Sequence, residues 1–188
     1  TLVDTAPLGV QLINERGVVH DDKQYELDVL IYATGFQWMG TGSFNMIVGK
    51  EGRSLRDKWS EEGTQTFLGI HNHGFPNLFT MSGPQGGGGQ FNFMRGLESH
   101  TDYIRWMLTT MRDRGARTVD VHKQPEIEYA EHCKQADILT SPLRDCLSYY
   151  NGDGTAEPGS LAYYGGPKKW HELRAEAQAT LSAYVFDG

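Results

Sequence analysis

Two short runs of β-forming residues open the chain, and a longer apolar run follows. The stretch "LGVQLINERGVVH", residues 8–20, places Gly17 at the third position of a turn, which suits a hairpin with a left-handed residue. In "YELDVLIYATGF", residues 25–36, apolar side chains are nearly continuous from Leu27 to Tyr32. Such a run is typical of a strand buried on both faces in a parallel sheet. We therefore predict a hairpin and then a buried strand that ends at Thr34.

The middle of the chain has weaker periodicity. A short helix is predicted around Ser54–Ser60, and a strand is predicted in "TFLGI", residues 66–70. A second short apolar run, residues 78–81, is closed by Gly83-Pro84.

The second half is dominated by helical spacing. Apolar residues recur three and four positions apart over residues 92–114, which predicts an amphipathic helix that ends at Gly115. A strand over 117–121 and helices over 125–139 and 168–181 follow, and a glycine-rich loop over 148–167 precedes the last helix. Alternating strands and helices indicate an α/β fold.

Composition and charge narrow the classes of function. The 188 residues carry a formal net charge of −7, which argues against a nucleic-acid partner. No apolar run reaches the length of a membrane-spanning helix, and the first residues do not form a signal peptide. Cys133 and Cys146 are isolated, so we expect reduced thiols in a cytoplasmic protein. The chain starts at Thr1 in what reads as mid-domain sequence, and we expect it to be part of a longer polypeptide.

The stretch "GPQGGGGQFNF" from Gly83 to Phe93 is the main candidate site. It places a glycine-rich loop directly before the start of a long helix, where unpaired N–H groups and a partial positive charge face outward. Such a helix start accommodates a phosphate, a carboxylate or the electron-rich edge of a reduced flavin. A flexible surface loop is the alternative. Neither GxGxxG nor GxxxxGK[ST] is present.

Three further features have weaker signals. The end of the predicted strand at "ATGF" could face a cofactor, although an ordinary turn is favoured on the tripeptide alone. His71 and His73 form an HxH pair without a third ligand, so they are interpreted as loop histidines near a cofactor edge or as surface residues. The pairs Tyr149-Tyr150 and Tyr163-Tyr164 suit either the core or a lid over a ligand.

Taken in order, "YELDVLIYATGF", "GFPNLFTMSGP" and "NFMRGLESHTDYIRWML" resemble the C-terminal third of a Baeyer–Villiger monooxygenase, a class B flavoprotein monooxygenase. The later stretch "YYGGPKKWHELRAEA" resembles the family's C-terminal lid and last helix. The resemblance implies an enzyme that uses FAD and NADPH to insert one oxygen atom next to a ketone carbonyl. It also implies that both GxGxxG fingerprints, the signature motif and the catalytic arginine lie upstream, so no catalytic residue is assigned within this chain.

The resemblance implies the C-terminal portion of a flavoprotein with two dinucleotide-binding domains, built from strands of a buried sheet and packed helices. Residues 1–33 would end the NADPH-binding domain, residues 34–147 would belong to the FAD-binding domain, and residues 148–188 would form a lid loop and the C-terminal helix. The implied cofactor-binding residues are Thr34, Gly35, Phe36, Gly83, Pro84, Asn92, Phe93 and Tyr149. The implied substrate pocket is Gly88, Gly89, Gln90 and Phe91, and no metal site is implied.

Two departures from the family pattern affect these expectations. Tyr149 stands where the family usually has a Trp, which replaces an indole N–H by a phenol. Four glycines at 86–89 are more than usual and would enlarge the pocket for a bulky ketone. The expected partners are the upstream remainder of the enzyme, the ketone and O2. A related enzyme that oxidises nitrogen or sulfur, and an inactive fragment, are the alternatives.

Overall fold

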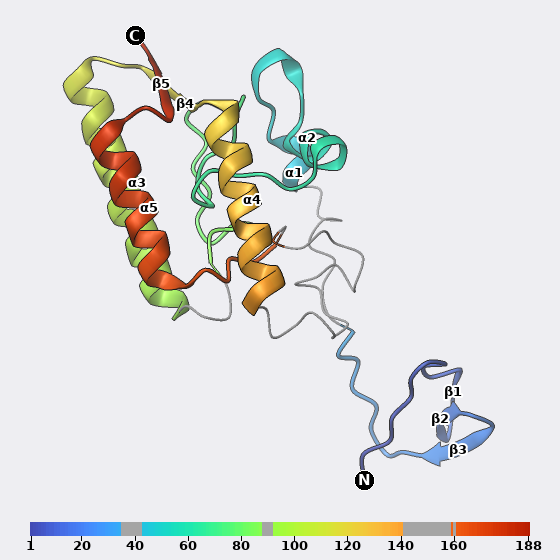
Figure 1. The fold of residues 1–188 in the computed structure, drawn as a ribbon. Coiled ribbons are helices and arrows are strands. Elements are labelled where there is room, and N and C mark those ends of the chain that lie inside the picture. Colours follow the sequence, from blue (N-terminus) through green and yellow to red (C-terminus); the bar gives the residue numbers. More distant parts are fainter. Residues whose placement is uncertain (35–42, 88–91, 141–158, 160) are drawn as a thin grey trace. The chain divides into compact units, whose positions relative to one another are not determined.

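The computed structural model describes residues 1–34, 43–87, 92–140, 159 and 161–188. The chain divides into two compact units, Thr1–Phe36 and Gln37–Gly188. Figure 1 labels their elements, and each unit is described here by itself. Within the described residues, no helix has the length and apolar character needed to cross a membrane.

The first unit is a small antiparallel sheet. Its strands are β1 (Leu12–Asn14), β2 (Gly17–His20) and β3 (Lys23–Glu26), in the order β1-β2-β3. The predicted hairpin is therefore confirmed, with Asn14 opposite Gly17. Gly17 has φ +138°, and a Cβ there would lie 2.1 Å from the carbonyl oxygen of Tyr25. Only glycine allows this approach between β2 and β3.

The predicted buried strand after this sheet is wrong. Residues 27–34 have no regular secondary structure, and the side chains of Val29 and Ile31 are 73% and 81% exposed. A strand buried on both faces needs neighbouring strands and covering helices. The described residues of this unit contain only the three short antiparallel strands, so nothing in them covers the apolar run.

The second unit begins with short helices. They are α1 (Ser43–Met46), η1 (Lys50–Gly52) and α2 (Leu55–Glu62). The predicted helix around Ser54–Ser60 is confirmed as α2, and it starts where the Ser54 hydroxyl accepts a hydrogen bond from the Asp57 N–H at 3.1 Å. Apolar side chains of this region form a separate small core: Leu55, Trp59 and Phe75, with Phe44, Ile47 and Leu78 packed against them.

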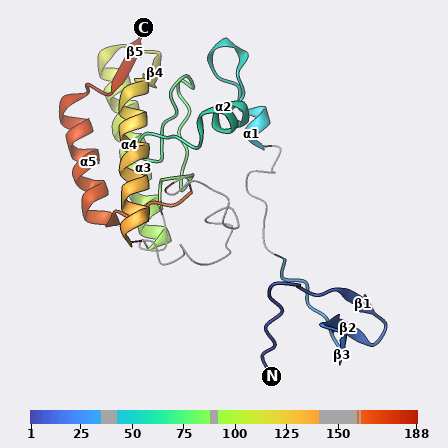
Figure 2. The same cartoon turned by 45° about the vertical axis from the view of Figure 1, so that its right-hand side comes forward.

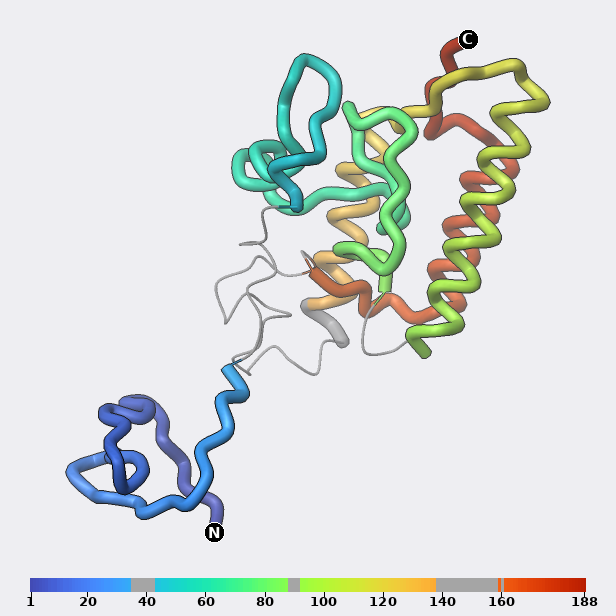
Figure 3. The backbone as a smooth tube through the Cα atoms, turned by 180° about the vertical axis from the view of Figure 1, so that it is seen from behind, coloured from blue at the N-terminus to red at the C-terminus, as the bar shows by residue number. Residues whose placement is uncertain are grey.

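Residues 64–87 form an irregular segment that lies between α3 and α4 (Figure 3). The strand predicted at 66–70 is not formed, and a single bridge joins Phe67 to His71. The apolar run at 78–81 also forms no strand. Leu68 and Gly69 have φ values of +58° and +69°. These left-handed residues turn the chain back on itself and end any strand. The apolar pattern of residues 66–70 correctly indicates that they are buried, but they are buried in a loop and not in a strand.

Three long helices enclose this segment: α3 (Phe93–Arg114), α4 (Lys123–Thr140) and α5 (Gly166–Thr180). Figure 2 shows α5 beside α4, with α3 behind α4 in that view. The three predicted long helices are confirmed, and Gly115 ends α3 with φ +68° as expected. The predicted strand β4 (Thr118–Val121) is also present, and it pairs with an unpredicted strand, β5 (Tyr184–Asp187), antiparallel.

The main core lies where the helices, the β4-β5 sheet and the irregular segment meet. Its fully buried side chains include two aromatic residues from different helices, Tyr103 of α3 and Trp170 of α5. The indole N–H of Trp170 donates to the carbonyl oxygen of Leu68 at 3.1 Å. The loop is therefore held by side chains of the helices around it, which fixes the segment that leads to α3.

Candidate functional site

The loop Gly83–Gly87, called here the glycine loop, leads from the irregular segment toward α3. Pro84, Gln85 and Gly86 are buried, and the Gly86 N–H donates to the Gly83 carbonyl at 3.0 Å in a tight turn. The Gly87 carbonyl accepts from the Tyr163 N–H at 3.1 Å. The described part of the loop is thus packed and hydrogen-bonded, so it is not a flexible surface loop.

The two described glycines of the GGGG run have different surroundings. A Cβ on Gly86 would lie 2.9 Å from the Gly69 carbonyl oxygen and 3.0 Å from the His100 ring. A Cβ on Gly87 would meet nothing within 4 Å among the described residues. Gly86 is therefore required by close packing, whereas Gly87 borders open space.

The start of α3 is exposed. Asn92 has extended backbone angles, and its side-chain oxygen accepts a hydrogen bond from the Arg95 N–H at 3.1 Å. Phe93 and Met94 follow with side chains 64% and 65% exposed. The first N–H groups of a helix have no partner within the helix. This end of a 22-residue helix therefore offers donors and a partial positive charge to an electron-rich group.

His100 connects the glycine loop to α3. Its Nδ1 accepts a hydrogen bond from the Ser82 N–H at 3.2 Å, and its ring lies 5.2 Å from that of Trp170. Burial lowers the pKa of His100 to about 4. The ring is therefore neutral at physiological pH, as its role as an acceptor requires.

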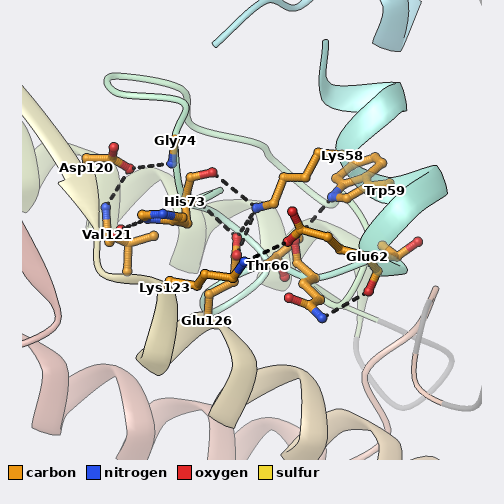
Figure 4. Close-up of polar contacts among 12 residues, drawn as sticks. Lys58, Trp59, Glu62, Thr66, His73, Gly74, Asp120, Val121, Lys123 and Glu126 are labelled. Atoms are coloured by element: carbon orange, nitrogen blue, oxygen red, sulfur yellow. Dashed lines mark hydrogen bonds and ion pairs between the residues drawn. The ribbon is translucent and has the colours of Figure 1, made fainter. Parts of the chain in front are cut away.

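A second polar cluster lies beneath α2 (Figure 4). The Lys58 ammonium lies 2.6 and 2.8 Å from the two carboxylate oxygens of Glu126, and it donates to the His73 carbonyl at 3.2 Å. The Lys58 and Glu126 side chains are only 2% and 0% exposed. The His73 N–H also donates to Glu126 at 2.8 Å. Residues from α2, α4 and the irregular segment therefore share one buried charge pair.

Burial dominates the electrostatics of this cluster. It lowers the pKa of Lys58 and raises the pKa of Glu126, and the attraction between the two charges opposes both changes. Asp120 extends the cluster by pairing with Lys50 at 2.9 Å and accepting from the Gly74 N–H at 3.1 Å. These groups bind one another and connect elements of the fold, so the cluster is interpreted as structural.

The structure describes only some of the residues implied by the resemblance. Gly83, Pro84, Asn92 and Phe93 lie in the glycine loop or at the start of α3. Thr34 is exposed and belongs to the other unit. The remaining implied residues lie outside the described residues: Gly35, Phe36, Gly88, Gly89, Gln90, Phe91 and Tyr149.

The structure decides between the alternatives for the histidine pair and for the second tyrosine pair. The surface alternative is wrong for His71: it is buried, its Nε2 lies 2.9 Å from the Tyr103 hydroxyl, and burial lowers its pKa to about 3. His73 is partly buried against the Val121 carbonyl. Tyr163 and Tyr164 are buried, which favours the core over a lid. The described residues contain no group of three ligands suited to a metal.

Comparison with known proteins places this chain in a family. A scan of protein-family models finds no match. A Baeyer–Villiger monooxygenase of Penicillium patulum is 34% identical over 201 aligned residues, covering 97% of this chain and 32% of that protein. One of Streptomyces coelicolor is 34% identical over 179 residues, covering 92% and 30%. The chain thus spans about a third of the length of these relatives.

Solved structures give the same picture. A steroid monooxygenase bound to NADP has a TM-score of 0.79 at 27% identity, covering 95% of this chain and 33% of that one. The polycyclic ketone monooxygenase of Thermothelomyces thermophila has a TM-score of 0.76 at 28% identity, covering 99% and 32%. The chain belongs to the Baeyer–Villiger monooxygenases and corresponds to a C-terminal part of such a protein. The resemblance and the fold class inferred from the sequence are confirmed.

Proposed function

We propose that this chain is the C-terminal part of an enzyme that uses FAD and NADPH to convert a bulky or cyclic ketone into an ester or lactone. The observation that carries the proposal is the 34% identity to a Baeyer–Villiger monooxygenase over 97% of the chain. Relatives solved as complexes with FAD and NADP support the choice of cofactors. Relatives named for cyclohexanone and for polycyclic ketones support the choice of substrate.

The proposed reaction consumes one ketone, one O2, one NADPH and one proton. One oxygen atom is inserted between the carbonyl carbon and a neighbouring carbon, and the other leaves as water. NADPH supplies the two electrons and becomes NADP+. FAD, when bound, supplies the chemistry that activates oxygen, while the protein positions the reactants and excludes water.

The residues of this chain fit a supporting role toward the cofactor. The exposed start of α3, with Asn92 capping the helix, would turn its partial positive charge toward the electron-rich edge of the flavin. Gly83 and Pro84 shape the loop that leads there. His100 holds that loop against α3 through the Ser82 N–H. These residues orient and stabilise, and the proposal assigns no proton transfer to any of them.

We further propose that Gly88, Gly89, Gln90 and Phe91 border the ketone, that Thr34, Gly35 and Phe36 contact a cofactor, and that Tyr149 lies near the nicotinamide nucleotide. The three segments 1–33, 34–147 and 148–188 would then serve the NADPH domain, the FAD domain and the closing lid and helix. The upstream remainder of the enzyme, the ketone and O2 are the proposed partners, in the cytoplasm.

The two alternatives predict different behaviour. Oxidation of nitrogen or sulfur is less favoured because the relatives bear Baeyer–Villiger names. An inactive fragment agrees with the matched third of the relatives' length. The chain alone should bind FAD weakly, since we place the adenosine and pyrophosphate sites upstream. Stoichiometric sub-micromolar binding, followed by flavin fluorescence, would contradict that placement.

The direct test uses the full-length enzyme with FAD, NADPH, 18O2 and a panel of cyclic ketones, and it analyses products by mass spectrometry. We expect an ester or lactone that carries one 18O atom. Amines and thioethers of similar size form the second panel. Rapid oxidation of amines without any labelled ester would replace the proposed function by nitrogen oxidation.

Substrate size is tested at Gly88. Replacing it with Leu adds volume where we place the ketone and should lower kcat/KM for a bulky ketone relative to a small one by about 10- to 200-fold. Loss of fold or of FAD would lower both values together, so the ratio isolates the pocket. An unchanged ratio in FAD-loaded enzyme would remove this glycine from the substrate pocket.

A further inference from the structure

Gln85 is the most highly connected side chain of the glycine loop. It is 1% exposed, and its carboxamide makes four hydrogen bonds. Oε1 accepts from the N–H and the hydroxyl of Thr66, at 3.0 and 2.8 Å. Nε2 donates to the carbonyls of Thr64 and Gly159, at 3.1 and 2.9 Å. A carboxamide has two donor and two acceptor positions, so every one of them is used.

The backbone of Gln85 continues the same connections. Its N–H donates to the Leu161 carbonyl at 3.1 Å, and its carbonyl accepts from the Tyr129 hydroxyl at 2.8 Å. Two residues on, the Gly87 carbonyl accepts from the Tyr163 N–H. Three segments that lie apart in the sequence therefore meet at Gln85: residues 64–66, Tyr129 of α4, and residues 159 and 161.

The backbone angle of Gln85 is unfavourable for a residue with a side chain. Its φ is +60°, in the left-handed region, where the Cβ of a non-glycine residue is crowded by the backbone. Glycine would adopt this angle without such crowding. A strained residue persists where the surroundings over-determine it, and such residues gather at functional sites.

Burial alone does not produce this arrangement. Asn72 carries the same chemical group and is also 1% exposed. Neither atom of its amide has a hydrogen-bond partner among the described residues. Two equally buried carboxamides thus differ in their hydrogen bonds: that of Gln85 makes four, and that of Asn72 makes none among the described residues. Asn72 therefore offers a matched control.

We infer that Gln85 is a positioning residue: its buried carboxamide ties the glycine loop to Thr64, Thr66 and Gly159 and so fixes the loop that leads to the start of α3. This inference rests on the proposed function for its catalytic consequence. If the ketone and the flavin lie beside this loop, a displaced loop misplaces the ketone, and displacements near 1 Å can lower a rate about 100-fold.

The catalytic test compares variants of the full-length, FAD-loaded enzyme. The readout is the coupling ratio, the moles of ester formed per mole of NADPH consumed. The uncoupled reaction lowers this ratio because it converts NADPH, O2 and a proton into NADP+ and H2O2. Gln85→Leu should lower this ratio about tenfold or more. NADPH oxidation without ketone, measured in the same variants, separates lost cofactor contacts at Gly83 and Pro84 from a misplaced ketone. Asn72→Leu, the matched control, should leave the ratio unchanged.

Two further variants separate strain from hydrogen bonding. Gln85→Gly removes the carboxamide and relieves the φ of +60°, so it should uncouple the reaction as Gln85→Leu does. Thr66→Val removes only the hydroxyl donor to Oε1 and should give a smaller effect in the same direction. Full coupling in Gln85→Gly would overturn the inference, because the amide would then be dispensable.

A second readout does not depend on ketone oxidation. Amide hydrogen exchange in Gln85→Leu should rise about tenfold at both 83–87 and 159–163, as expected when buried hydrogen bonds are lost, and stay unchanged in the centre of α3. If wild-type enzyme forms no ester, the proposed function fails while this measurement still tests Gln85. Unchanged amide exchange at 159–163 would contradict the inference that Gln85 connects the glycine loop to this segment. Should Gln85→Leu fail to fold, Thr66→Val and Tyr129→Phe provide the same comparison.

Discussion

Two of the buried polar centres in the described part of the chain are built on different chemistry. Beneath α2, Lys58 and Glu126 bring opposite charges together from distant parts of the sequence. At the glycine loop, the polar groups are the neutral carboxamide of Gln85 and the neutral imidazole of His100. Each is held by backbone donors or acceptors. A buried charge pair is strongly destabilising when one partner is lost. A neutral amide with every position filled specifies one geometry at a lower electrostatic cost.

This difference separates stability from positioning. The charged centre connects α2 to α4 through side chains, so we expect its disruption to affect the unfolding equilibrium of this unit. The neutral centre connects three backbone segments, so we expect its disruption to shift a loop without unfolding the protein. Substitutions in each centre test this contrast.

Glu126→Leu should produce the largest loss of stability. It leaves the Lys58 ammonium, 2% exposed, without its carboxylate, and breaking such a pair costs about 3–5 kcal/mol. Urea unfolding measures the free energy of unfolding. Glu128→Leu, on the same helix but exposed, should change the free energy of unfolding by less than about 0.5 kcal/mol.

The double variant Lys58→Met, Glu126→Leu should recover much of the loss, since no charge is left buried. A loss below about 1 kcal/mol in the single variant would show that the Lys58 charge is hydrated.

Acid should weaken the neutral centre through His100. Burial lowers its pKa from 6.5 to about 4, so the unfolded chain takes up a proton first as pH falls. The stability from this group is complete above pH 6.5 and is lost between pH 6.5 and 4, amounting to about 3 kcal/mol. Arg174 lowers this pKa further, whereas a backbone hydrogen bond with Gly86 raises it.

The measurement compares urea unfolding of wild type and His100→Gln at pH 7, 6 and 5. Gln keeps an acceptor for the Ser82 N–H but does not titrate, so the difference between the two proteins should shrink as pH falls. His71, whose pKa burial lowers to about 3, contributes equally to both proteins and cancels. Parallel pH curves for the two proteins would contradict a neutral, buried His100.

Neighbouring glycines should respond differently to a methyl group. Gly86→Ala places a Cβ 2.9 Å from the Gly69 carbonyl oxygen, and overpacking of this kind costs about 1–3 kcal/mol. Gly87→Ala meets nothing within 4 Å among the described residues and should be neutral or stabilising by up to about 1 kcal/mol. Thermal unfolding of the two variants decides this. Equal losses would mean that both glycines serve backbone conformation and not space.

The long helices and the hairpin are predictable because their signals are local. The spacing of Met107 and Met111 and the glycine at 115 define α3 within its own sequence. The irregular segment is not predictable, because its apolar residues are buried by helices that follow much later, as when Trp170 donates to Leu68. The apolar run at 27–32 shows the converse, since a buried-strand pattern forms no strand without neighbouring strands.

The candidate site is predictable only in outline. The glycine loop before a helix start is visible in the sequence. The role of Gln85 is not, because its partner Gly159 lies 74 positions away and no periodic pattern links the two. The Lys58–Glu126 pair, 68 positions apart, has the same limitation. Hydrogen-bond partners between irregular segments depend on the tertiary fold and leave no local spacing.

The smallest expected effect concerns the start of α3. Asn92→Ala removes the acceptor for the Arg95 N–H and should cost about 1 kcal/mol of unfolding free energy. Asn92→Asp keeps the cap, since aspartate is an equally good N-cap residue, so its stability should change by only a few tenths of a kcal/mol. The two variants therefore rank clearly in urea unfolding.

The two variants should rank in the opposite order when the rate of flavin reduction is measured in the full-length enzyme. The Asn92→Asp substitution would add a negative charge at the helix end that we propose faces the electron-rich edge of the reduced flavin, and like charges repel. In full-length enzyme, Asn92→Asp should therefore slow flavin reduction by NADPH, followed by stopped-flow absorbance, more than Asn92→Ala does. High salt should diminish this difference because the helix start is exposed. If Asn92→Ala is the slower variant at every salt concentration, the helix cap matters to the site only through stability, and the proposed flavin contact falls.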